Sequence, residues 1–377
     1  MSARNYTVDL IAGDGIGQEV LPAAVRCLDH IGVRFGFRVD WRERPWGSEY
    51  YFTHRKMMPV DAIEQLATGD AILHGAIGHP DLPDHETLWG LLIPIRREFL
   101  QYVNLRPIRL LPGVTPLLRS LSYGEDDAPA CLDIVVVREN VEGEYSAIGG
   151  HAYRGRPEEL VIQDAVFTRT GVTRVARFAA ELAASRSGRL TSATKSNGIV
   201  HSMPFWDEVV SSVASEYAGV RLDSVLIDAL AAKIVLDPGA FDVIVASNLF
   251  GDILSDLLAA VAGSIGIAAS ANINPPRRHP SMFEPVHGSA PDIAGTGVAN
   301  PVGQMWSAAM MLDHLGEPEA GAALMAAIES TMAAGTRTPD LGGLAGTEEF
   351  TTAVLQAIDE PGDRPVRPFG EKASNAS

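Results

Sequence analysis

The sequence has 377 residues, which suits two domains better than one ordinary core. Hydrophobic residues make up 46% and charged residues 20%, a balance typical of globular proteins and not of disordered chains. The 30 Lys and Arg residues against 47 Asp and Glu residues give a net charge of −17. This charge argues against nucleic acid as a partner, because no excess of cations is available to neutralise phosphates. An anionic substrate must therefore be bound by locally clustered cations.

The cysteines and the apolar runs indicate where in the cell the protein is expected. Cys27 and Cys131 are the only cysteines, so neither a disulfide framework nor a thiolate metal site is expected, and a reducing, cytoplasmic location is the default. Residues 1–8 contain no apolar core of a signal peptide. The best apolar run, 257–271, is interrupted by Gly263 and Gly266, so we expect a soluble protein without a membrane partner.

Short β-branched runs alternate with helical patterns along the chain, as in an α/β fold. In chain order the patterns predict strands at 7–12, 38–43, 71–75, 134–137, 190–194, 220–226 and 243–246. The predicted helices are at 18–30, 59–67, 172–187, 205–217, 229–236, 253–262, 302–315 and 320–334. The Pro-rich polar tail, 361–377, is expected to be poorly ordered.

The first predicted strand ends in a glycine-rich turn, Gly13 to Gly17, before a helix. A dinucleotide-binding fingerprint would need a third glycine where this chain has Gln18, and Asp40 lies farther downstream than the usual acidic ribose partner. The sequence therefore favours a tight turn that needs glycine for backbone reasons, and not a standard Rossmann fold.

Three aspartates are candidates for metal ligands. Asp252 and Asp256 lie four residues apart, so they share one face of a helix and can both approach a hard cation. Asp228 follows the apolar run 225–227 at the start of another predicted helix. Open α/β sheets bind ligands at the carboxyl ends of their strands, which favours a metal site. The alternative is acidic residues in the first turn of a helix, where the dipole stabilises them.

Two further groups of residues could act on a small anion. Arg96, Arg106 and Arg138 each lie at or near an apolar run and are interpreted as strand-end arginines that bind carboxylates, with ordinary surface salt bridges as the alternative. Lys195 and Tyr145 could exchange protons with a substrate, although their separation in sequence says nothing about their distance in space.

The segment 283–295, with Asn300 shortly after it, is rich in Gly, Pro and small polar residues. Such a long loop is more often functional than structural. Its backbone N–H groups could receive a pyrophosphate, and Asp292 could accept hydrogen bonds from a ribose diol.

These motifs, in this order, resemble the β-decarboxylating dehydrogenases, the isopropylmalate and isocitrate dehydrogenase family. The resemblance covers residues 9–343 and rests on AGDGIG at 12–17, NLRP at 104–107, VREN at 137–140, TSATKSN at 191–197, ASNLFGDILSD at 246–256 and FEPVHGSAPDIAG at 283–295. WGSEYY at 46–51, PDLPDH at 80–85, LWG at 88–90 and REFLQYVNLRP at 97–107 are similar to the branch of tartrate and decarboxylating D-malate dehydrogenases.

The resemblance implies an isopropylmalate dehydrogenase-like α/β fold with two domains: a discontinuous cofactor-binding domain, 1–101 and 263–360, and a second domain, 102–262, on the metal, substrate and dimer side. It implies a homodimer that shares its active sites, with Lys195 and one metal aspartate, Asp228, reaching across the interface. The implied cofactors are NAD and Mn²⁺ or Mg²⁺, with K⁺ as a further cation.

The resemblance also assigns roles to individual residues. Substrate carboxylates would be bound by Arg96, Arg106 and Arg138, the metal by Asp228, Asp252 and Asp256, and the acid–base pair would be Tyr145 and Lys195. Nucleotide binding is assigned to Glu284, His287, Gly288, Ser289, Ala290, Asp292, Ile293, Asn300 and Asp340.

The substrate is expected to be a small 2-hydroxy dicarboxylate, D-malate or a tartrate, which is oxidised and decarboxylated. Trp89 stands where isopropylmalate dehydrogenases carry an alkyl-receiving Glu, so its indole would fill the space of an isopropyl group. The segment 91–95 (LLIPI) is more apolar than this branch leads us to expect, which leaves 3-isopropylmalate as the alternative substrate. A non-catalytic protein that binds a nucleotide or a dicarboxylate is the competing class.

Overall fold

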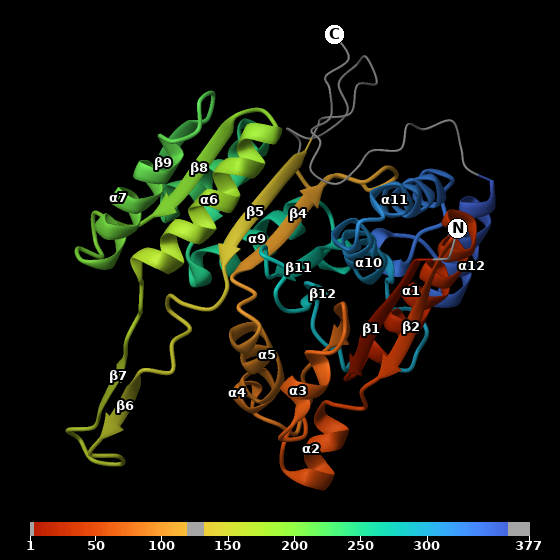
Figure 1. The fold of residues 1–377 in the computed structure, drawn as a ribbon, viewed down its shortest axis with the longest axis horizontal. Helices are drawn as coiled ribbons and strands as arrows, with labels where there is room; N and C mark the ends of the chain where they lie inside the picture. Colours follow the sequence, from red (N-terminus) through yellow and green to blue (C-terminus); the bar gives the residue numbers. More distant parts are fainter. Residues whose placement is uncertain (1–3, 119–131, 361–377) are drawn as a thin grey trace.

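The computed structural model describes residues 4–118 and 132–360. In these ranges ten strands form one mixed sheet in the order β2-β1-β3-β12-β11-β4-β5-β10-β8-β9 (Figure 1). Neighbouring strands are parallel except around β11 and β4, where β12–β11, β11–β4 and β4–β5 are antiparallel. The strands are β1 (Arg4–Gly13), β2 (Phe37–Glu43), β3 (Ala71–Ala76), β4 (Val103–Arg109), β5 (Asp133–Glu139), β8 (Arg189–Thr194), β9 (Arg221–Leu226), β10 (Val243–Ala246), β11 (Ala269–Ile273) and β12 (Ser281–Pro285).

Helices cover both ends of this sheet. One group packs together beside β1, β3 and β12 and consists of α1 (Gly17–Phe35), α10 (Val302–Leu315), α11 (Pro318–Ala333) and α12 (Thr347–Asp359). At the other end, α6 (Arg169–Ser185) and α7 (Ser202–Ala214) pack on one face, with α8 (Ile227–Leu236) and α9 (Asn248–Val261) behind them in Figure 1. Short helices border the lower edge: α2 (Ser48–His54), α3 (Ala62–Leu66), α4 (Asp84–Thr87), the π-helical turn Leu88–Leu92 and α5 (Ile93–Glu98).

The predicted α/β class is confirmed, and each predicted strand and helix of the described ranges has a counterpart. The differences lie at the centre of the sheet. The sequence patterns missed β4, β11 and β12, because these buried strands carry polar side chains where apolar ones are usual: Asn104 and Arg106 on β4, Asn272 on β11, and Ser281 and Glu284 on β12. They also missed α2, α4, α5, α12 and a projecting hairpin of β6 (Gly149–Ala152) and β7 (Leu160–Gln163).

Both ends of the sheet are assembled from the ranges expected for the two domains. β1, β2, β3, β11 and β12 come from 1–101 and 263–360, whereas β4, β5, β8, β9 and β10 come from 102–262, and the two sets meet at the antiparallel pair β11–β4. The division into domains stays a prediction. Cys131 and the tail 361–377 lie outside the described residues. Within the described ranges, no helix combines the length and the apolar character that a bilayer crossing requires.

The turn Gly13–Gly17 supports the structural interpretation. Gly13 and Gly15 have φ angles of 69° and 52°, in the left-handed region that favours glycine. A Cβ at Gly13 would lie 1.9 Å from the Ala76 carbonyl oxygen. Asp14 in this turn is buried and accepts hydrogen bonds from the Ser48 N–H, the Ser48 hydroxyl and the Gly78 N–H at 2.8, 2.6 and 2.9 Å. The turn therefore joins β1, β3 and α2 at close range.

Glu139, at the end of β5, should make the folded protein less stable as the pH rises. Burial raises the pKa of its carboxyl from 4.5 to about 7, despite N–H donors from Glu142 and Val141 and the nearby Arg174. Between these two pH values the folded state keeps a proton that the unfolded state has lost, so stability falls as pH rises through 7. The shift corresponds to about 3 kcal/mol in the free energy of unfolding.

The check is urea denaturation of the wild type and Glu139→Gln at pH 5 and pH 8. We expect the wild type to lose more stability than the variant between these pH values, because the amide does not titrate. Equal losses in both proteins would contradict the assignment.

Candidate active site

Two arginines and two aspartates meet where β4 and β5 run beside α9. Arg138 lies near the end of β5, is 2% exposed, and donates to the Asp252 carboxylate on α9. Arg106 Nη2 lies 3.3 Å from Asp252 Oδ1, and Arg106 Nη1 lies 3.3 Å from Asp256 Oδ1. Asp252 and Asp256 are one helical turn apart, as predicted, and neither lies in the first turn of α9, which begins five residues earlier than expected, at Asn248. Their place is therefore not explained by the helix dipole.

Tyr145 joins this cluster through its hydroxyl, which donates to Asp252 Oδ2 at 2.7 Å. Burial and this hydrogen bond raise the pKa of Tyr145 to about 12, so the phenol keeps its proton at neutral pH. Burial by itself would raise the pKa of Asp252, but Arg138 and Arg106 hold it below its ordinary value. The protonated Tyr145 hydroxyl therefore donates to an ionised Asp252 carboxylate.

Arg96 approaches the same region from another element. It lies in α5 and is 6% exposed, and its Nη2 donates to Glu284 Oε1 on β12 at 2.7 Å. The expectation that Arg96 and Arg106 lie at strand ends is wrong: Arg96 is helical and Arg106 is in the middle of β4. The apolar stretch before Arg96 misled the prediction, because a short apolar run fits a buried helix as well as a strand.

Lys195 and Asp228 form a second, separate pair. Lys195 follows β8, Asp228 lies in the first turn of α8, and Lys195 Nζ lies 2.8 Å from Asp228 Oδ1. The hydrogen bond from Lys195 lowers the pKa of Asp228. Across the described residues, no three His, Cys, Asp or Glu side chains are close enough to hold one metal ion. One copy of the chain therefore does not bring Asp228 to Asp252 and Asp256.

The loop after β12 lies against the turn Gly13–Gly17. The Ile16 N–H donates to the Ser289 carbonyl at 2.9 Å, and Ala290 and Ile293 pack against Ile16 and Val20. At the far end of the loop, Asn300 Nδ2 donates to Asp340 Oδ2 at 3.0 Å. These contacts bring most of the predicted nucleotide-binding residues into one neighbourhood, of which Gly288, Asp292 and Asp340 are exposed.

Not all backbone donors of this loop are free for a pyrophosphate. The N–H groups of Gly295 and Gly297 donate to the two carboxylate oxygens of Glu19 at 2.6 and 3.0 Å. Glu284 also differs from the rest of the predicted set, because it is buried in β12 and faces Arg96. His287 is partly buried, which lowers the pKa of its ring, and its Nδ1 lies 3.0 Å from the Gly288 carbonyl.

Comparison with known proteins shows the family to which this chain belongs. The model of the isocitrate/isopropylmalate dehydrogenase family matches residues 7–354. The chain belongs to this family.

Described relatives are similar to this chain along nearly its whole length. A probable tartrate dehydrogenase/decarboxylase from Agrobacterium vitis is 51% identical, over 94% of this chain and 98% of the relative. The decarboxylating D-malate dehydrogenase of Escherichia coli is 53% identical, over 94% of this chain and 99% of the relative. The crystal structure of an isocitrate dehydrogenase from Methylococcus capsulatus superposes with a TM-score of 0.83 at 30% identity, over 94% of this chain and 99% of that chain. The isopropylmalate dehydrogenase-like fold is thus confirmed.

As a member of this dehydrogenase family the chain is an oxidoreductase. Its acidic residues fit a divalent cation only in part. Asp252 and Asp256 offer carboxylate oxygens, the donors that Mg²⁺ and Mn²⁺ prefer, and both side chains are partly exposed. A third carboxylate would complete the site, and within the described residues it does not come from the same copy.

The sequence patterns missed several polar residues of this site. Ser255 accepts a hydrogen bond from Arg106 Nη1 at 2.6 Å, and Arg106 Nε donates to Asn104 Oδ1 at 2.8 Å. Arg97 donates to the Tyr145 carbonyl at 2.6 Å, and its guanidinium lies 4.8 Å from the Trp89 ring centre. Asn104 and Arg97 lie inside motifs that carry the family resemblance, so their position in those motifs could have identified them as candidate site residues. Asn272 lies in none of them.

Proposed function

We propose that this enzyme oxidises and decarboxylates a small 2-hydroxy dicarboxylate with NAD, with D-malate preferred to tartrate. The observation that carries the proposal is the cluster of Arg96, Arg106 and Arg138, three buried guanidinium groups beside two aspartates and a protonated tyrosine. Buried arginines in a protein of net charge −17 are suited to binding a compact dianion.

The roles are those that the family resemblance assigns, and the chemistry of each side chain suits them. Arg96, Arg106 and Arg138 bind the substrate carboxylates. Asp228, Asp252 and Asp256 would hold a divalent cation, which would supply a Lewis acid, and the loop after β12 would hold NAD, which would supply the hydride acceptor. Lys195 takes the proton of the substrate hydroxyl, and Tyr145 returns a proton to C3 after CO₂ leaves. Tyr145 keeps its phenolic proton at neutral pH, as the second role requires.

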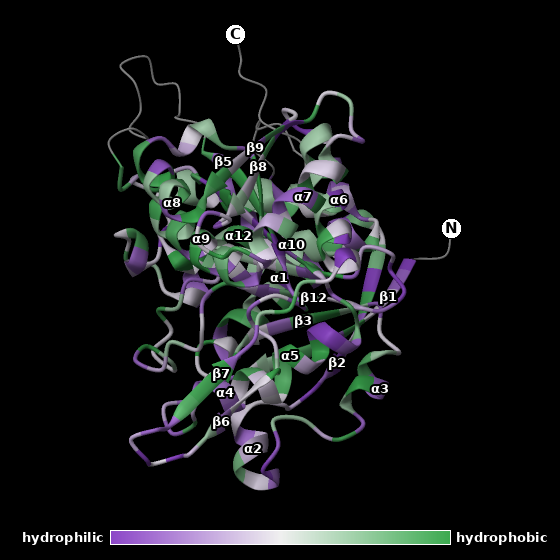
Figure 2. Ribbon diagram, turned by 90° about the vertical axis from the view of Figure 1, so that its left-hand side faces the viewer, coloured by the Kyte–Doolittle hydropathy of each residue, from purple (hydrophilic) through white to green (hydrophobic). Residues whose placement is uncertain are grey.

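A homodimer accounts for the separation of Lys195 and Asp228 from the rest of the site. In the proposal these two residues serve the partner's cluster. The β6–β7 hairpin supports this assembly, because it projects from the rest of the molecule (Figure 1) and its strand β7 is hydrophobic (Figure 2), with Leu160, Val161 and Ile162 exposed. Apolar side chains gathered on such a hairpin are typical of a surface that another chain covers.

In the proposal, Trp89 lies in the wall of the substrate site and discriminates against 3-isopropylmalate in favour of D-malate. The Arg97 guanidinium lies over the Trp89 ring at 4.8 Å, a cation–π contact that stabilises this position of the ring. Leu91, Leu92 and Ile93 are 0%, 6% and 3% exposed, so they pack inward and offer little surface to a substrate alkyl group. Overlap with a held ring excludes an isopropyl group more sharply than lost attraction does.

Steady-state kinetics with NAD, Mn²⁺ and K⁺ test the proposal on D-malate, the tartrate isomers and 3-isopropylmalate. We expect kcat/KM to be highest for D-malate. A higher kcat/KM for 3-isopropylmalate would reassign the enzyme to that substrate, and no NADH formation from any of them would refute the proposed reaction.

NAD should be preferred to NADP. Asp292 is exposed and has no side-chain partner among the described residues, so its carboxylate is available to a ribose 2′-hydroxyl and would repel a 2′-phosphate. We expect a higher kcat/KM with NAD, and a smaller difference between the two cofactors in Asp292→Ala. Glu19→Ala, which removes another carboxylate near the loop, is the control for general loop damage. Equal use of NADP by the wild type would contradict the assignment.

A further inference from the structure

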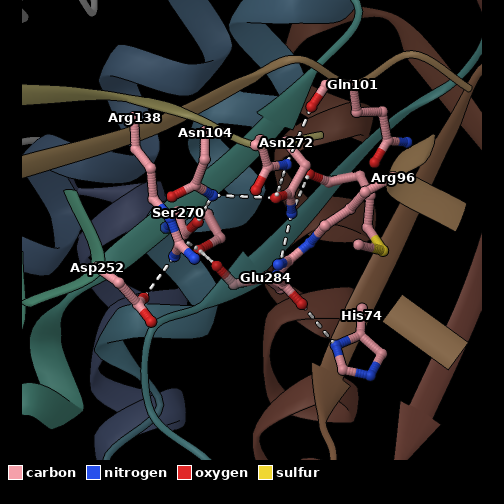
Figure 3. A network of polar contacts seen from close by, with 12 residues as sticks. His74, Arg96, Gln101, Asn104, Arg138, Asp252, Ser270, Asn272 and Glu284 are labelled. Carbon is pink, nitrogen blue, oxygen red and sulfur yellow. Dashed lines mark hydrogen bonds and ion pairs between the residues drawn. The ribbon is translucent and has the colours of Figure 1, made fainter. Parts of the chain in front are cut away.

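The strip of sheet between the arginines contains buried amides where a sheet centre usually has apolar side chains. Asn104 on β4 and Asn272 on β11 are both 0% exposed and lie opposite each other in the antiparallel ladder. Buried amides are costly unless each donor and acceptor has a partner. Here they are hydrogen-bonded to each other and to the side chains that hold the arginines (Figure 3).

The bonds form one unbroken chain from Arg106 to Arg96. Arg106 Nε donates to Asn104 Oδ1 at 2.8 Å, and Asn104 Nδ2 donates to Asn272 Oδ1 at 3.0 Å. Asn272 Nδ2 donates to Glu284 Oε1 at 2.7 Å, and the same oxygen accepts from Arg96 Nη2 at 2.7 Å. The two guanidinium groups are thus joined across β4, β11, β12 and α5.

Asn272 is the hub of this chain. Its Oδ1 also accepts from Asn140 Nδ2 at 2.9 Å, two residues after Arg138, so the hub connects to all three arginine-bearing segments. On its other side, Glu284 is fixed by His74, whose Nδ1 lies 3.0 Å from Glu284 Oε2. The amides of Asn104 and Asn272 each have a partner for both the oxygen and the nitrogen, so rotation of either amide would break hydrogen bonds on both sides, and this part of the chain is rigid.

We propose that Asn272 is a positioning residue that fixes the separation of Arg96 and Arg106 and thereby selects the length of the dicarboxylate. The inference rests on the proposed function, in which these arginines bind the carboxylates of one substrate. A diacid that spans both guanidinium groups must match their spacing, and only a rigid link between them makes that spacing selective. Asn272 touches neither the substrate nor the cofactor in this assignment.

The test uses malonate, succinate and glutarate as competitive inhibitors of D-malate oxidation. The wild type should prefer succinate, which has the four-carbon backbone of malate. Asn272→Asp keeps the acceptor for Asn104 but sets an oxygen against Glu284 Oε1, so it cuts the chain at one bond. We expect the ratio of the inhibition constants of glutarate and succinate to fall about tenfold, within the range of coupling between contacting polar residues.

Asn274→Asp is the matched control. Asn274 directly follows β11, is 2% exposed, and donates to the Phe99 and Leu100 carbonyls at 3.0 Å, outside the chain between the arginines. This variant should change the three inhibition constants by a common factor. If Asn272→Asp does not fold, the smaller and uncharged Asn272→Ser replaces it, with a thermal melt as the criterion for folding.

The outcomes separate this inference from the proposed function. A wild type that oxidises D-malate but shows no length preference would overturn the inference alone, as would an Asn272 variant that weakens the three inhibitors equally. A wild type that neither oxidises a 2-hydroxy diacid nor binds any of the three inhibitors would refute both.

Discussion

Replacement of Lys195 by Met is expected to abolish substrate oxidation. Lys195 carries the only amino group assigned to accept the hydroxyl proton, and methionine keeps the length of the side chain without a base. Loss of a general acid or base typically costs about 10² to 10⁴ in rate. The measurement is kcat for NADH formation, with D-malate as substrate. Lys233→Met is the control, because Lys233 is exposed on α8 and its side chain pairs with no described residue. Near-normal oxidation by Lys195→Met would refute its role as the base.

A mixing experiment tests whether Lys195 serves the partner's site. Lys195→Met and Asp252→Asn subunits are each expected to be inactive as homodimers. In a heterodimer, one of the two shared sites receives a native Lys195 from one subunit and a native Asp252 from the other. Partial recovery of activity is therefore expected after subunit exchange. No recovery in verified heterodimers would place Lys195 and Asp252 in the same subunit's site.

Replacement of Tyr145 by Phe should slow protonation more than oxidation. The variant loses the hydroxyl that donates to Asp252 at 2.7 Å, while the ring can still pack beside Arg138. We expect pyruvate formation from added oxaloacetate to fall about 10² to 10⁴-fold, because the proton donor to C3 is gone. NADH formation from D-malate should fall less, since Lys195 remains.

Tyr217→Phe provides the comparison for Tyr145→Phe. It removes a similar hydrogen bond, from Tyr217 to Glu181 at 2.9 Å, on the α6–α7 surface. Its two half-reactions should keep wild-type rates. If Tyr145→Phe slowed both half-reactions by the same factor, a general disturbance of the Asp252 site would explain the result better than loss of an acid.

Local patterns in the sequence were enough to predict the parts of this protein that local physics controls. Short β-branched runs predicted seven of the strands, and helical periods predicted the long helices except α12, because each of these helices buries one apolar side against the core. The glycines of the turn Gly13–Gly17 were interpreted correctly as backbone requirements. The i, i+4 spacing of Asp252 and Asp256 was sufficient to predict that both lie on one face of a helix, which is α9.

The tertiary structure alone decided how the candidate site is assembled. Arg96 and Glu284 are 188 residues apart in sequence, and Asn104 and Asn272 are 168 apart, yet each pair is joined by a hydrogen bond. The periodicity of a sequence does not predict such a long-range contact. The polar side chains that form these bonds are also the reason why β4 and β11 were not predicted. The structure likewise showed Lys195 and Asp228 apart from Asp252. These relations depend on which strands lie side by side, a choice that the sheet makes through long-range packing and not through the local preferences of its residues.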